Sequence, residues 1–345
     1  MKGILLTEPE KLVVEEVEIP EPRQDEILLK VKRCGICGSD ISIYHGKHPY
    51  VKCPLVMGHE FSGVVEKLGS NVQNLSVGTR VTVIPHLVCK KCKQCNLQKY
   101  NLCEELKVLG AQADGAFQEY ITIPAEMAIP IPDSMSLDDA AMVEPACVAY
   151  HAAKRGGITQ NDKILIMGAG PIGVFVMQSS RVLGAKSVFI TDIDETRLRI
   201  ASNLGADRIF NLSNKTLEDI DGIGMDLSSI GIFFDCVGGR GEVLNSIIKT
   251  ASKGVRIIVV GVMRLDYEIP NLPDFIEHEL TLLGTSMYVP QDYKEMVDLI
   301  SSGKISTKGM ITHHFSISEL ASVFDMIDSG KEKFFKIMLR VSDGF

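Results

Sequence analysis

The first half of the chain alternates apolar and polar positions over short stretches that Pro and Gly interrupt. Residues 13–19 and 26–32 alternate in this way, and residues 61–65 and 79–84 carry many β-branched side chains between glycines. A period of two residues, bounded by turn formers, is typical of strands that bury one face. These segments predict an irregular, mainly β domain.

From residue 138 the pattern changes, first to an Ala-rich, helix-favouring stretch that ends at Arg155 and then to alternating strands and helices. The run 164–167 is continuously apolar, as expected for a strand buried on both faces. The alternation predicts a doubly wound parallel sheet, so the expected fold class is α/β with two different domains. The expected strands are 164–167, 187–191, 208–212, 230–235 and 255–260, with 280–283 compatible with a sixth, and the helices between them are 172–183, 195–204 and 242–251. After about residue 286 the pattern predicts helices at 291–302 and 318–329 and a final strand at 336–341.

Composition bounds the function without naming it. The 345 residues exceed what one compact core usually holds, which predicts two domains. The net charge of −8 argues against a nucleic-acid partner, because phosphate binding needs a basic surface. No stretch approaches the roughly 20 apolar residues of a membrane span, and the first residues lack the apolar core of a secretory signal. We therefore expect a cytoplasmic protein without a membrane partner.

A glycine-rich turn follows the first buried strand of the α/β half and opens a helix. In that context the G-x-G-x-x-G pattern indicates a dinucleotide site. The first glycine permits the tight turn, the second lets the backbone approach a pyrophosphate, and the third allows close packing of helix and strand. The helix N-terminus presents unpaired N–H groups to the phosphates. The turn reads Gly168-Ala169-Gly170-Pro171-Ile172-Gly173.

Asp192 ends the next strand, where a carboxylate accepts hydrogen bonds from ribose hydroxyls and repels the extra phosphate of NADP. The residues that follow continue the acidity, so the sequence predicts NAD as the cofactor. Arg197 could still reach the adenine side of the nucleotide, which keeps NADP open.

Nine cysteines in a chain without a secretory signal indicate metal or redox chemistry rather than disulfides. Four of them fall in one short segment, at a spacing that can close a tetrahedral shell around Zn²⁺. A closed shell leaves no open position, so this site is expected to be structural. An iron–sulfur cluster and a nucleic-acid-binding zinc ribbon, suggested by interleaved lysines, are the alternatives. The four residues are Cys89, Cys92, Cys95 and Cys103.

A second candidate set combines sulfur, nitrogen and oxygen donors. Cys37, His59, Glu60 and Glu144 could supply three or four ligands, as in a catalytic zinc site that keeps one position open. Taken singly, each has a simpler interpretation. The His-Glu pair is common at surfaces, Glu144 could be an ordinary helix residue, and Cys34 with Cys37 has the spacing of a thioredoxin-like redox pair.

The segment Gly58-His59-Glu60, with Gly63, Gly69 and Val72, resembles the zinc-binding signature of the medium-chain alcohol and polyol dehydrogenases. The order of motifs is also similar to that family, namely Cys-Gly-Ser-Asp, Gly-His-Glu, the four cysteines, Glu-Pro and the glycine-rich turn. The resemblance implies that Cys37, His59 and Glu60 bind a catalytic zinc ion, and that Glu144 binds it directly or through water. Cys34 then matches a position that is not a ligand.

The same resemblance implies the architecture. A GroES-like catalytic domain would consist of residues 1–150 and 286–345, and a Rossmann domain of residues 151–285 would bind NAD, with the active site in the cleft. Homodimers or homotetramers joined through the nucleotide domains are usual in the family. Each chain would hold one catalytic and one structural zinc ion.

The implied reaction is oxidation of an alcohol by NAD, in which zinc acts as a Lewis acid on the substrate hydroxyl and the cofactor accepts hydride at C4. Ser39, two residues after Cys37, is placed to accept the alcohol proton and pass it outward. The alternative is that Ser39 only serves the turn.

The substrate is less clearly indicated. A catalytic shell with Glu resembles sorbitol, butanediol, threonine and sugar-acid dehydrogenases. Residues 143–145 are similar to the polyol and butanediol members, whereas residues 108–117 and His86 are closer to the sugar-acid and threonine members. The stretch 285–288 lacks the arginine that sorbitol dehydrogenases carry there, which argues against sorbitol itself.

We therefore expect a secondary alcohol of a small polyhydroxylated substrate, a polyol or sugar acid. L-Threonine 3-dehydrogenase-like and butanediol dehydrogenase activities are the alternatives. Tyr44, His48 and His86 are candidate substrate contacts, and each is equally compatible with a scaffold role. A zinc-ribbon binding protein is the non-enzyme alternative, but it leaves the glycine-rich turn and Asp192 unexplained.

Overall fold

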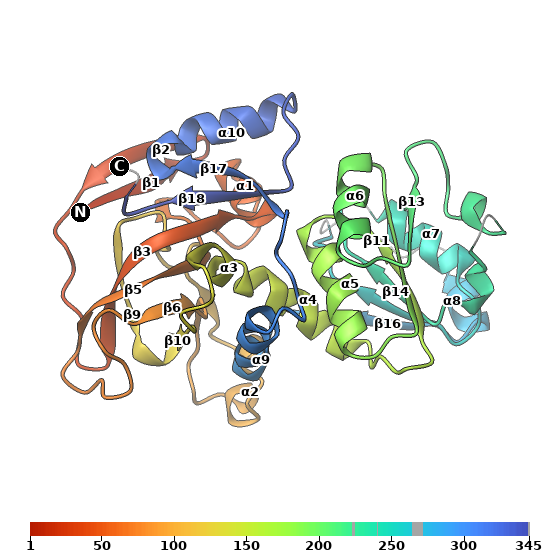
Figure 1. Ribbon diagram of the computed structural model, residues 1–345, viewed down its shortest axis with the longest axis horizontal. Coiled ribbons are helices and arrows are strands. Elements are labelled where there is room, and N and C mark those ends of the chain that lie inside the picture. The colour runs from red at the N-terminus through yellow and green to blue at the C-terminus, as the bar shows by residue number, and fades with distance from the viewer. Residues whose placement is uncertain (223–224, 240, 264–271, 344–345) are drawn as a thin grey trace. The chain divides into compact units, whose positions relative to one another are not determined.

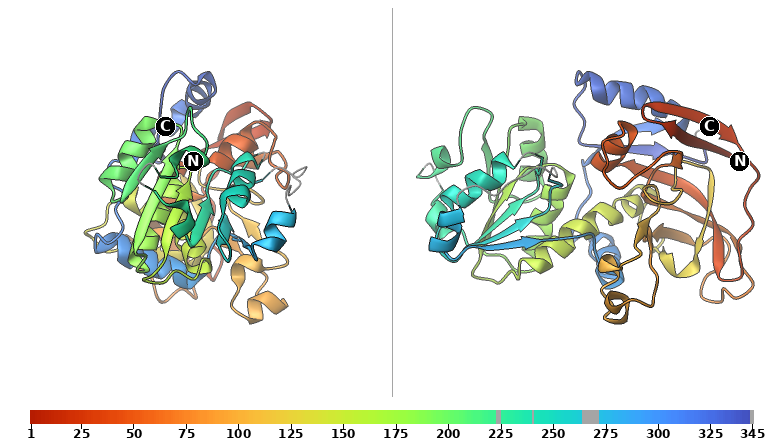
Figure 2. Two further views of the ribbon diagram at one scale, coloured as in Figure 1. Left: turned by 90° about the vertical axis from the view of Figure 1, so that its right-hand side faces the viewer. Right: turned by 180° about the vertical axis from the view of Figure 1, so that it is seen from behind.

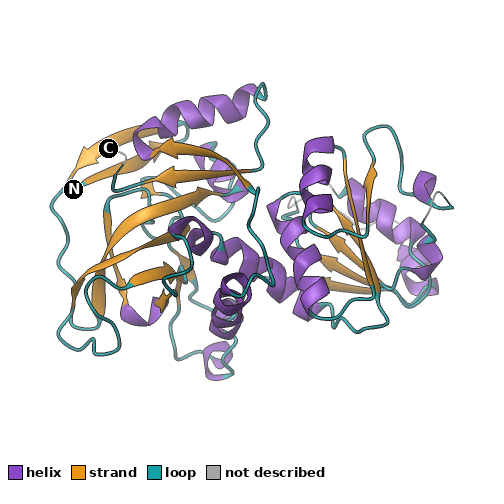
Figure 3. Ribbon diagram, in the orientation of Figure 1, coloured by secondary structure: helices purple, strands orange, loops and turns teal. Residues whose placement is uncertain are grey.

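The computed structural model describes residues 1–222, 225–239, 241–263 and 272–343. The chain divides into two compact units. Unit 1 consists of Met1–Glu144, Val289–Ser302 and Thr307–Phe345, and unit 2 of Pro145–Tyr288 and Gly303–Ser306. Figure 1 traces the chain by residue number, and Figure 3 shows strands and long loops dominating unit 1 while strands and helices alternate in unit 2.

Unit 1 is organised around the long strand β3 (Glu26–Ile36), whose Ile27, Leu29 and Val31 are fully buried. This strand pairs antiparallel with β5 (Glu60–Leu68) and with β18 (Lys336–Arg340), so the two ends of the sequence share one sheet (Figure 1). The strand order is β10-β6-β5-β3-β18-β17, and β9 also pairs with β3. The further strands are β6 (Arg80–Val83), β9 (Tyr120–Pro124), β10 (Ala128–Pro130) and β17 (Ile311–Ser316).

Two smaller sheets complete the β structure described in unit 1. The strand predicted at 13–19 ends early, at Glu16, because its partner β1 begins at Lys2 and offers no ladder beyond that residue. The strands are β1 (Lys2–Glu8), β2 (Lys11–Glu16) and β4 (Leu55–Val56) in one sheet, and β7 (His86–Leu87) and β8 (Lys107–Val108) in the other.

Among the helices described in unit 1, α3 (Leu137–Ala141) packs against the central strands β3 and β5. Helix α9 (Pro290–Ser301) is anchored by a buried hydroxyl. The hydroxyl of its Tyr293 donates to the carbonyl of Val83 at 2.8 Å and lies 2.8 Å from Thr82 Oγ1. The helices are α1 (Gly38–Tyr44), α2 (Lys93–Asn96), α3 (Leu137–Ala141), α9 (Pro290–Ser301) and α10 (Leu320–Ser329), with 3-10 turns η1 (Tyr100–Leu102), η2 (Ala125–Met127) and η5 (Ile317–Glu319).

The helix predicted over 138–155 is divided in two, into α3 and α4 (Val143–Arg155). Pro145 has no N–H, so it cannot bond to the carbonyl of Ala141, four residues earlier. The break falls at Met142, whose N–H bonds to the carbonyls of Asp138 and Asp139. Glu144 consequently lies in the first turn of a new helix.

The strands of unit 2 form a parallel sheet in the order β13-β12-β11-β14-β15-β16. Helices α5 and α6 cover one face and α7 and α8 the other, as Figures 1 and 2 show from different sides. This is the predicted doubly wound sheet, and the apolar run at 280–283 does add its sixth strand. The strands are β11 (Lys163–Met167), β12 (Ser187–Asp192), β13 (Arg208–Asn211), β14 (Ile232–Asp235), β15 (Arg256–Val259) and β16 (Thr281–Gly284).

Apolar side chains hold the helices of unit 2 against this sheet. Ile247 and Ile248 of α7 belong to one buried cluster with Leu165, Phe233 and Ile257 of three neighbouring strands. The remaining elements are α5 (Pro171–Val182), α6 (Glu195–Asn203), α7 (Glu242–Thr250), α8 (Leu272–Glu277), η3 (Glu218–Ile220) and η4 (Leu227–Ser229). The fold is therefore α/β with a mainly β unit and a Rossmann-type unit, as predicted. In the described part of the chain, no helix has both the length and the apolar character needed to cross a membrane.

Candidate functional site

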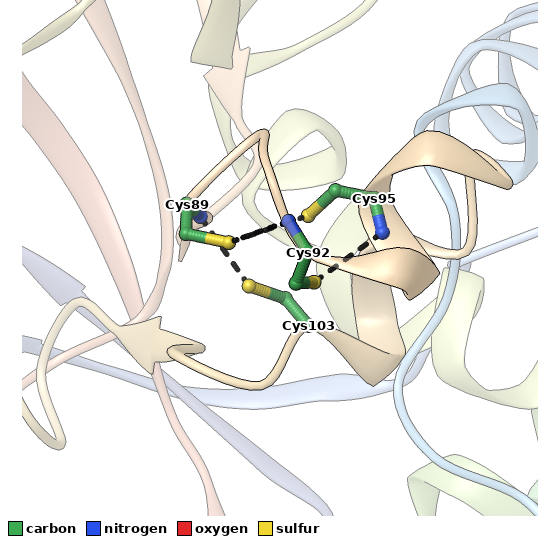
Figure 4. Close-up of side chains that lie close together, drawn as sticks. All are labelled: Cys89, Cys92, Cys95 and Cys103. Carbon is green, nitrogen blue, oxygen red and sulfur yellow. Dashed lines mark hydrogen bonds between the residues drawn. The ribbon is translucent and has the colours of Figure 1, made fainter.

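Four cysteines converge at the loop that contains α2. The ligand sulfurs of Cys89, Cys92, Cys95 and Cys103 all lie within 4.8 Å of one another, and none of these cysteines forms a disulfide (Figure 4). Sulfurs held by one zinc ion at about 2.3 Å in a tetrahedron must lie about 3.8 Å apart. The Sγ atoms of Cys89 and Cys95 are 4.0 Å apart, which matches that requirement.

Backbone N–H groups point at these sulfurs. The N–H of Cys89 donates to Cys103 Sγ at 3.3 Å, and the N–H of Cys92 donates to Cys89 Sγ at 3.4 Å. Hydrogen bonds from the backbone N–H groups of Glu104 and Cys95 lower the pKa of the Cys92 thiol. Donors directed at sulfur favour the thiolate, which is the form that binds a metal.

Two of the lysines of this loop have carboxylate partners on the protein surface. Lys90 Nζ lies 2.6 Å from Glu126 Oε1, and Lys91 Nζ lies 3.3 Å from Glu105 Oε1. Their charges are thus partly neutralised, which weakens the zinc-ribbon hypothesis of a basic surface for nucleic acid.

A second group joins Cys37, His59 and Glu60. Cys37 is the N-cap of α1, and His59 and Glu60 lie where β5 begins. Pairing of β3 with β5 sets Gly35 opposite Glu60, which brings the residues just after β3 to the start of β5. One sulfur, nitrogen or oxygen atom of each side chain lies within 4.8 Å of the others. A mixed set of this kind, with three donors, fits a catalytic zinc ion that keeps an open position.

Asp40, for which no role was predicted, contacts two members of this group. It is fully buried, and its Oδ2 accepts the Cys37 N–H at 2.8 Å. Its Oδ1 faces His59 Nδ1 at 3.5 Å. Burial opposes a charged His59, but the nearby Asp40 and Cys37 outweigh it and raise the His59 pKa well above its usual value. A site that attracts a proton to this imidazole also attracts a metal cation. The capping-box spacing of Cys37 and Asp40 could have identified this residue.

Ser39 lies next to the imidazole, with its Oγ 3.4 Å from His59 Nε2. Glu144 is buried, but its carboxylate is not among the atoms that gather with Cys37, His59 and Glu60. Cys34 is fully buried outside that group, and burial raises its pKa well above the usual thiol value. A thiol with a raised pKa is unreactive, which argues against the redox-pair interpretation.

A buried lysine, missed in the sequence, forms an ion pair with Glu60. Lys336 of β18 is 4% exposed, and its Nζ contacts Oε2 of Glu60, which is 1% exposed. Burial alone would lower the pKa of Lys336, but the charges of Glu60 and Cys37 raise it. Lys336 lies far from Glu60 in the sequence, so no local sequence pattern predicts their contact.

The three candidate substrate contacts differ. Tyr44 stacks on Phe324 with ring centroids 4.1 Å apart, which assigns it to the core. Burial lowers the pKa of His86 to about 4, and His59 adds to the effect. The pKa of His48 is also lowered, by burial and then by His59. The charge of His59 thus contributes to the lowered pKa of both imidazoles.

The glycine-rich turn of unit 2 leaves space at one position and fills it at another. Gly168 has φ +97°, a conformation that side chains disfavour. A Cβ on Gly173 would overlap the carbonyl oxygen of Gly168 and lie 3.0 Å from its carbon. By contrast, a Cβ on Gly170 would meet no described atom within 4 Å. Pro171 and Ile172 then begin α5.

Asp192 is tied to this turn. Its Oδ2 accepts the N–H of Ala169 at 2.7 Å, and its Oδ1 accepts the N–H of Asp194 at 2.9 Å. Arg197 Nη1 approaches Asp192 Oδ2 at 4.0 Å. The carboxylate therefore sits at the end of β12 beside the glycine turn, where the adenosine ribose of a dinucleotide would lie.

Both parts of the chain match known protein families. Residues 23–133 match the alcohol dehydrogenase GroES-like domain, and residues 171–302 match the zinc-binding dehydrogenase family. The starvation-sensing protein RspB of Escherichia coli K12 is 34% identical over 344 residues, covering 99% of this chain and 100% of that protein. Sorbitol dehydrogenase of Bacillus subtilis 168 is 31% identical (98% and 97% covered), and L-idonate 5-dehydrogenase of Vitis vinifera is 33% identical (85% and 82% covered).

Solved structures agree with the sequence matches. RspB of Escherichia coli CFT073 in complex with NADH superposes with a TM-score of 0.91 at 34% identity, covering 99% of both chains. A zinc-binding dehydrogenase of Sinorhizobium meliloti 1021 bound to NADP has a TM-score of 0.92 at 29% identity, covering 98% of both. The chain thus belongs to the medium-chain zinc alcohol and polyol dehydrogenase family, and it is an oxidoreductase that acts on CH–OH groups.

Proposed function

We propose that this dehydrogenase oxidises a secondary alcohol of a polyol or sugar acid, and that NAD accepts the hydride. The observation that carries the proposal is the group formed by Cys37, His59 and Glu60, whose ligand atoms lie within 4.8 Å of one another. Three protein ligands with one open position are typical of catalytic zinc, whereas four thiolates are typical of structural zinc. We accordingly propose two zinc ions per chain.

Zinc in this group supplies a Lewis acid that lowers the pKa of a substrate hydroxyl towards neutrality. Asp40 faces His59 Nδ1 and so orients Nε2 as the ligand atom. Ser39, whose Oγ lies 3.4 Å from that nitrogen, would accept the alcohol proton while its own hydroxyl proton passes outward to solvent. Glu144 is proposed as a direct or water-bridged ligand, to be tested by the zinc content of Glu144→Ala.

The choice of NAD over NADP rests on Asp192. Its carboxylate is held at the end of β12 by two backbone N–H groups, where it would repel a 2′-phosphate. Among the structural relatives one is bound to NADH and another to NADP, so the family resemblance alone does not decide between them. A higher kcat/KM with NADP than with NAD would overturn this choice.

The substrate class rests on the donor set and on the relatives. Sorbitol and L-idonate, named for two of them, are both polyhydroxylated compounds with secondary alcohols. The arginine that sorbitol dehydrogenases carry is absent from Thr285–Tyr288, which shifts the proposal from sorbitol towards other members of the class. We also propose a homodimer or homotetramer, which light scattering of the purified protein would test.

The experiment that tests the proposal measures NADH absorbance for a panel of polyols, aldonates, sugar phosphates, L-threonine and butanediol, on protein of known zinc content. We expect turnover with a polyol or aldonate, two zinc ions per chain, and loss of turnover in Cys37→Ser with NADH binding retained. Turnover with threonine or butanediol alone would replace the substrate class. The absence of zinc from the Cys37 site would overturn the proposed chemistry.

A further inference from the structure

A hollow of about 400 Å³ lies in unit 1 between two loops to which the proposed reaction assigns no role. Tyr50, Lys52 and Leu55 belong to one wall, and residues 111–114 form the other. Hollows of this size hold small organic molecules. The side chain of Tyr50 is 71% exposed, so a large ring with an apolar face is open to solvent where a ligand would cover it.

Hydrogen bonds from the backbone hold the two walls together. The N–H of Val56 donates to Oδ1 of Asp114 at 3.0 Å, and the N–H of Gly115 donates to the carbonyl of Val56 at 2.7 Å. The hollow is therefore formed before any ligand binds, which lowers the entropic cost of binding.

The polar groups of the hollow suit a carboxylate. Among the residues that the structure describes, Lys52 forms no ion pair, not even with Asp114 on the opposite wall. Gln112 accepts the Val108 N–H through its Oε1 at 3.0 Å, which leaves its amide N–H groups to donate. An ammonium group and an amide can both donate to one carboxylate. The negative charge of Asp114 disfavours a more highly charged group such as a phosphate.

Both walls lead directly to the metal-binding group. Leu55 precedes His59 by four residues, and at about 3.3 Å per residue the chain between them spans at most about 13 Å. On the other wall, a Cβ on Gly115 would overlap the carbonyl oxygen of Gly58, so the two segments are in close contact beside His59. An extended sugar acid, met by the flexible four-carbon side chain of Lys52, covers a distance of this order.

We propose that Lys52 and Gln112 bind the carboxylate of the substrate, with Tyr50 against its carbon chain, while a secondary hydroxyl lies at the proposed zinc site. This inference rests on the proposed function and narrows it from a polyol or sugar acid to a sugar acid. It makes Lys52 the residue that distinguishes an aldonate from the uncharged alditol of the same configuration.

The test compares kcat/KM for D-gluconate with sorbitol, L-idonate with L-iditol, and D-galactonate with galactitol. The members of each pair differ only in whether the chain ends in a carboxylate or a hydroxymethyl group. Lys52→Met removes the charge and keeps the length of the side chain, and Lys52→Arg keeps the charge. Gln112→Glu keeps an acceptor for the Val108 N–H and places a negative charge in the hollow. Lys47→Met is the matched control, because Lys47 is an exposed lysine of the same loop that does not line the hollow.

We expect the wild-type enzyme to prefer the aldonate of at least one pair. Lys52→Met should lower kcat/KM for that aldonate roughly tenfold, mainly through KM, as is typical for loss of a hydrogen bond to a charged group, and should leave the alditol unaffected. Gln112→Glu should act in the same direction through repulsion, while Lys52→Arg and Lys47→Met should keep the wild-type preference. Higher ionic strength should raise KM for the aldonate in the wild type and much less in Lys52→Met, because salt screens the exposed ammonium group.

Turnover of polyols but of no aldonate, or equal losses on both members of a pair in Lys52→Met, would overturn the inference and leave the proposed function intact. A higher kcat/KM with sorbitol 6-phosphate than with D-gluconate would also overturn it, because the anionic group would then be a phosphate. No turnover of any polyol or aldonate by protein with two zinc ions would overturn the proposed substrate class together with the inference.

Discussion

Replacing two glycines of the same turn, Gly173 and Gly170, by alanine should affect the stability of the protein differently. In Gly173→Ala the new Cβ overlaps the carbonyl oxygen of Gly168 and lies 3.5 Å from Ile166 Cγ2. An ordinary carbon–oxygen contact requires about 3.3 Å, so the turn or the helix must shift, at a cost of about 1–3 kcal/mol for overpacking. Alanine is favoured over glycine inside a helix by about 0.5–1 kcal/mol, which offsets part of that cost.

Gly170→Ala should behave differently. Its backbone has φ −72° and ψ −178°, which alanine adopts without strain, and the added Cβ meets no described atom within 4 Å. Alanine is a poorer N-cap than glycine, while it lowers the entropy of the unfolded chain by about 0.4–1 kcal/mol. Stability should therefore change by less than about 1 kcal/mol. The open space is where a pyrophosphate would lie, so NADH affinity should fall.

The assay combines thermal unfolding, followed by circular dichroism, with NADH binding, followed by fluorescence. Gly173→Ala should lower both the unfolding temperature and the affinity, and Gly170→Ala only the affinity. Wild-type affinity in Gly170→Ala would show that the cofactor does not pass over this residue. Wild-type stability in Gly173→Ala would refute the packing argument itself.

Three further predictions concern unit 1. Asp40→Asn should weaken catalytic zinc binding by roughly 10- to 100-fold, because an amide donor facing His59 Nδ1 places the imidazole proton on Nε2. Competition with a chelator measures this affinity. Asp114→Asn is the control, because its side-chain oxygen can still accept the Val56 N–H. Cys103→Ser should leave one zinc ion per chain by elemental analysis while Cys37 keeps its metal; two ions in this variant would contradict the closed four-sulfur site. The hydrogen bond to Glu10 raises the pKa of His45, so the stabilisation from charged His45 is full below the unfolded pKa of about 6.5 and is lost as pH rises through the folded pKa. His45→Gln should therefore lower the free energy of unfolding more at pH 5.5 than at pH 8.5 in denaturant titrations. Equal losses of stability at the two pH values would show that the charge of His45 does not stabilise the fold.

Much of the fold could be predicted because hydrophobic periodicity is a local property. The continuous apolar run at 164–167 and the glycine turn after it identified the Rossmann-type unit. The division between α3 and α4 was missed, although Pro145 shows it, because the Ala-rich composition favoured one helix. Strand β17 was also missed, since His313 and His314 give it no apolar alternation and it depends on pairing with β18.

The metal-binding group shows the same limit. Cys37, His59 and Glu60 lie in short motifs and were found as a set, and the spacing of Asp40 from Cys37 offered a local signal that went unused. Lys336 reaches Glu60 only because β18 enters the sheet beside β3. No pattern in the sequence near either residue predicts that contact.

The position of β18 also determines the order in which the protein can be assembled during synthesis. Unit 2 is formed almost entirely by the continuous segment Pro145–Tyr288, so it can fold while the ribosome is still translating. The central sheet of unit 1 cannot close until residues 336–340 emerge, because they pair with the second half of β3. Until then that half of β3 has an unpaired edge, which is a template for association with other chains. A product that terminates before residue 336 is therefore an aggregation-prone intermediate rather than a smaller dehydrogenase.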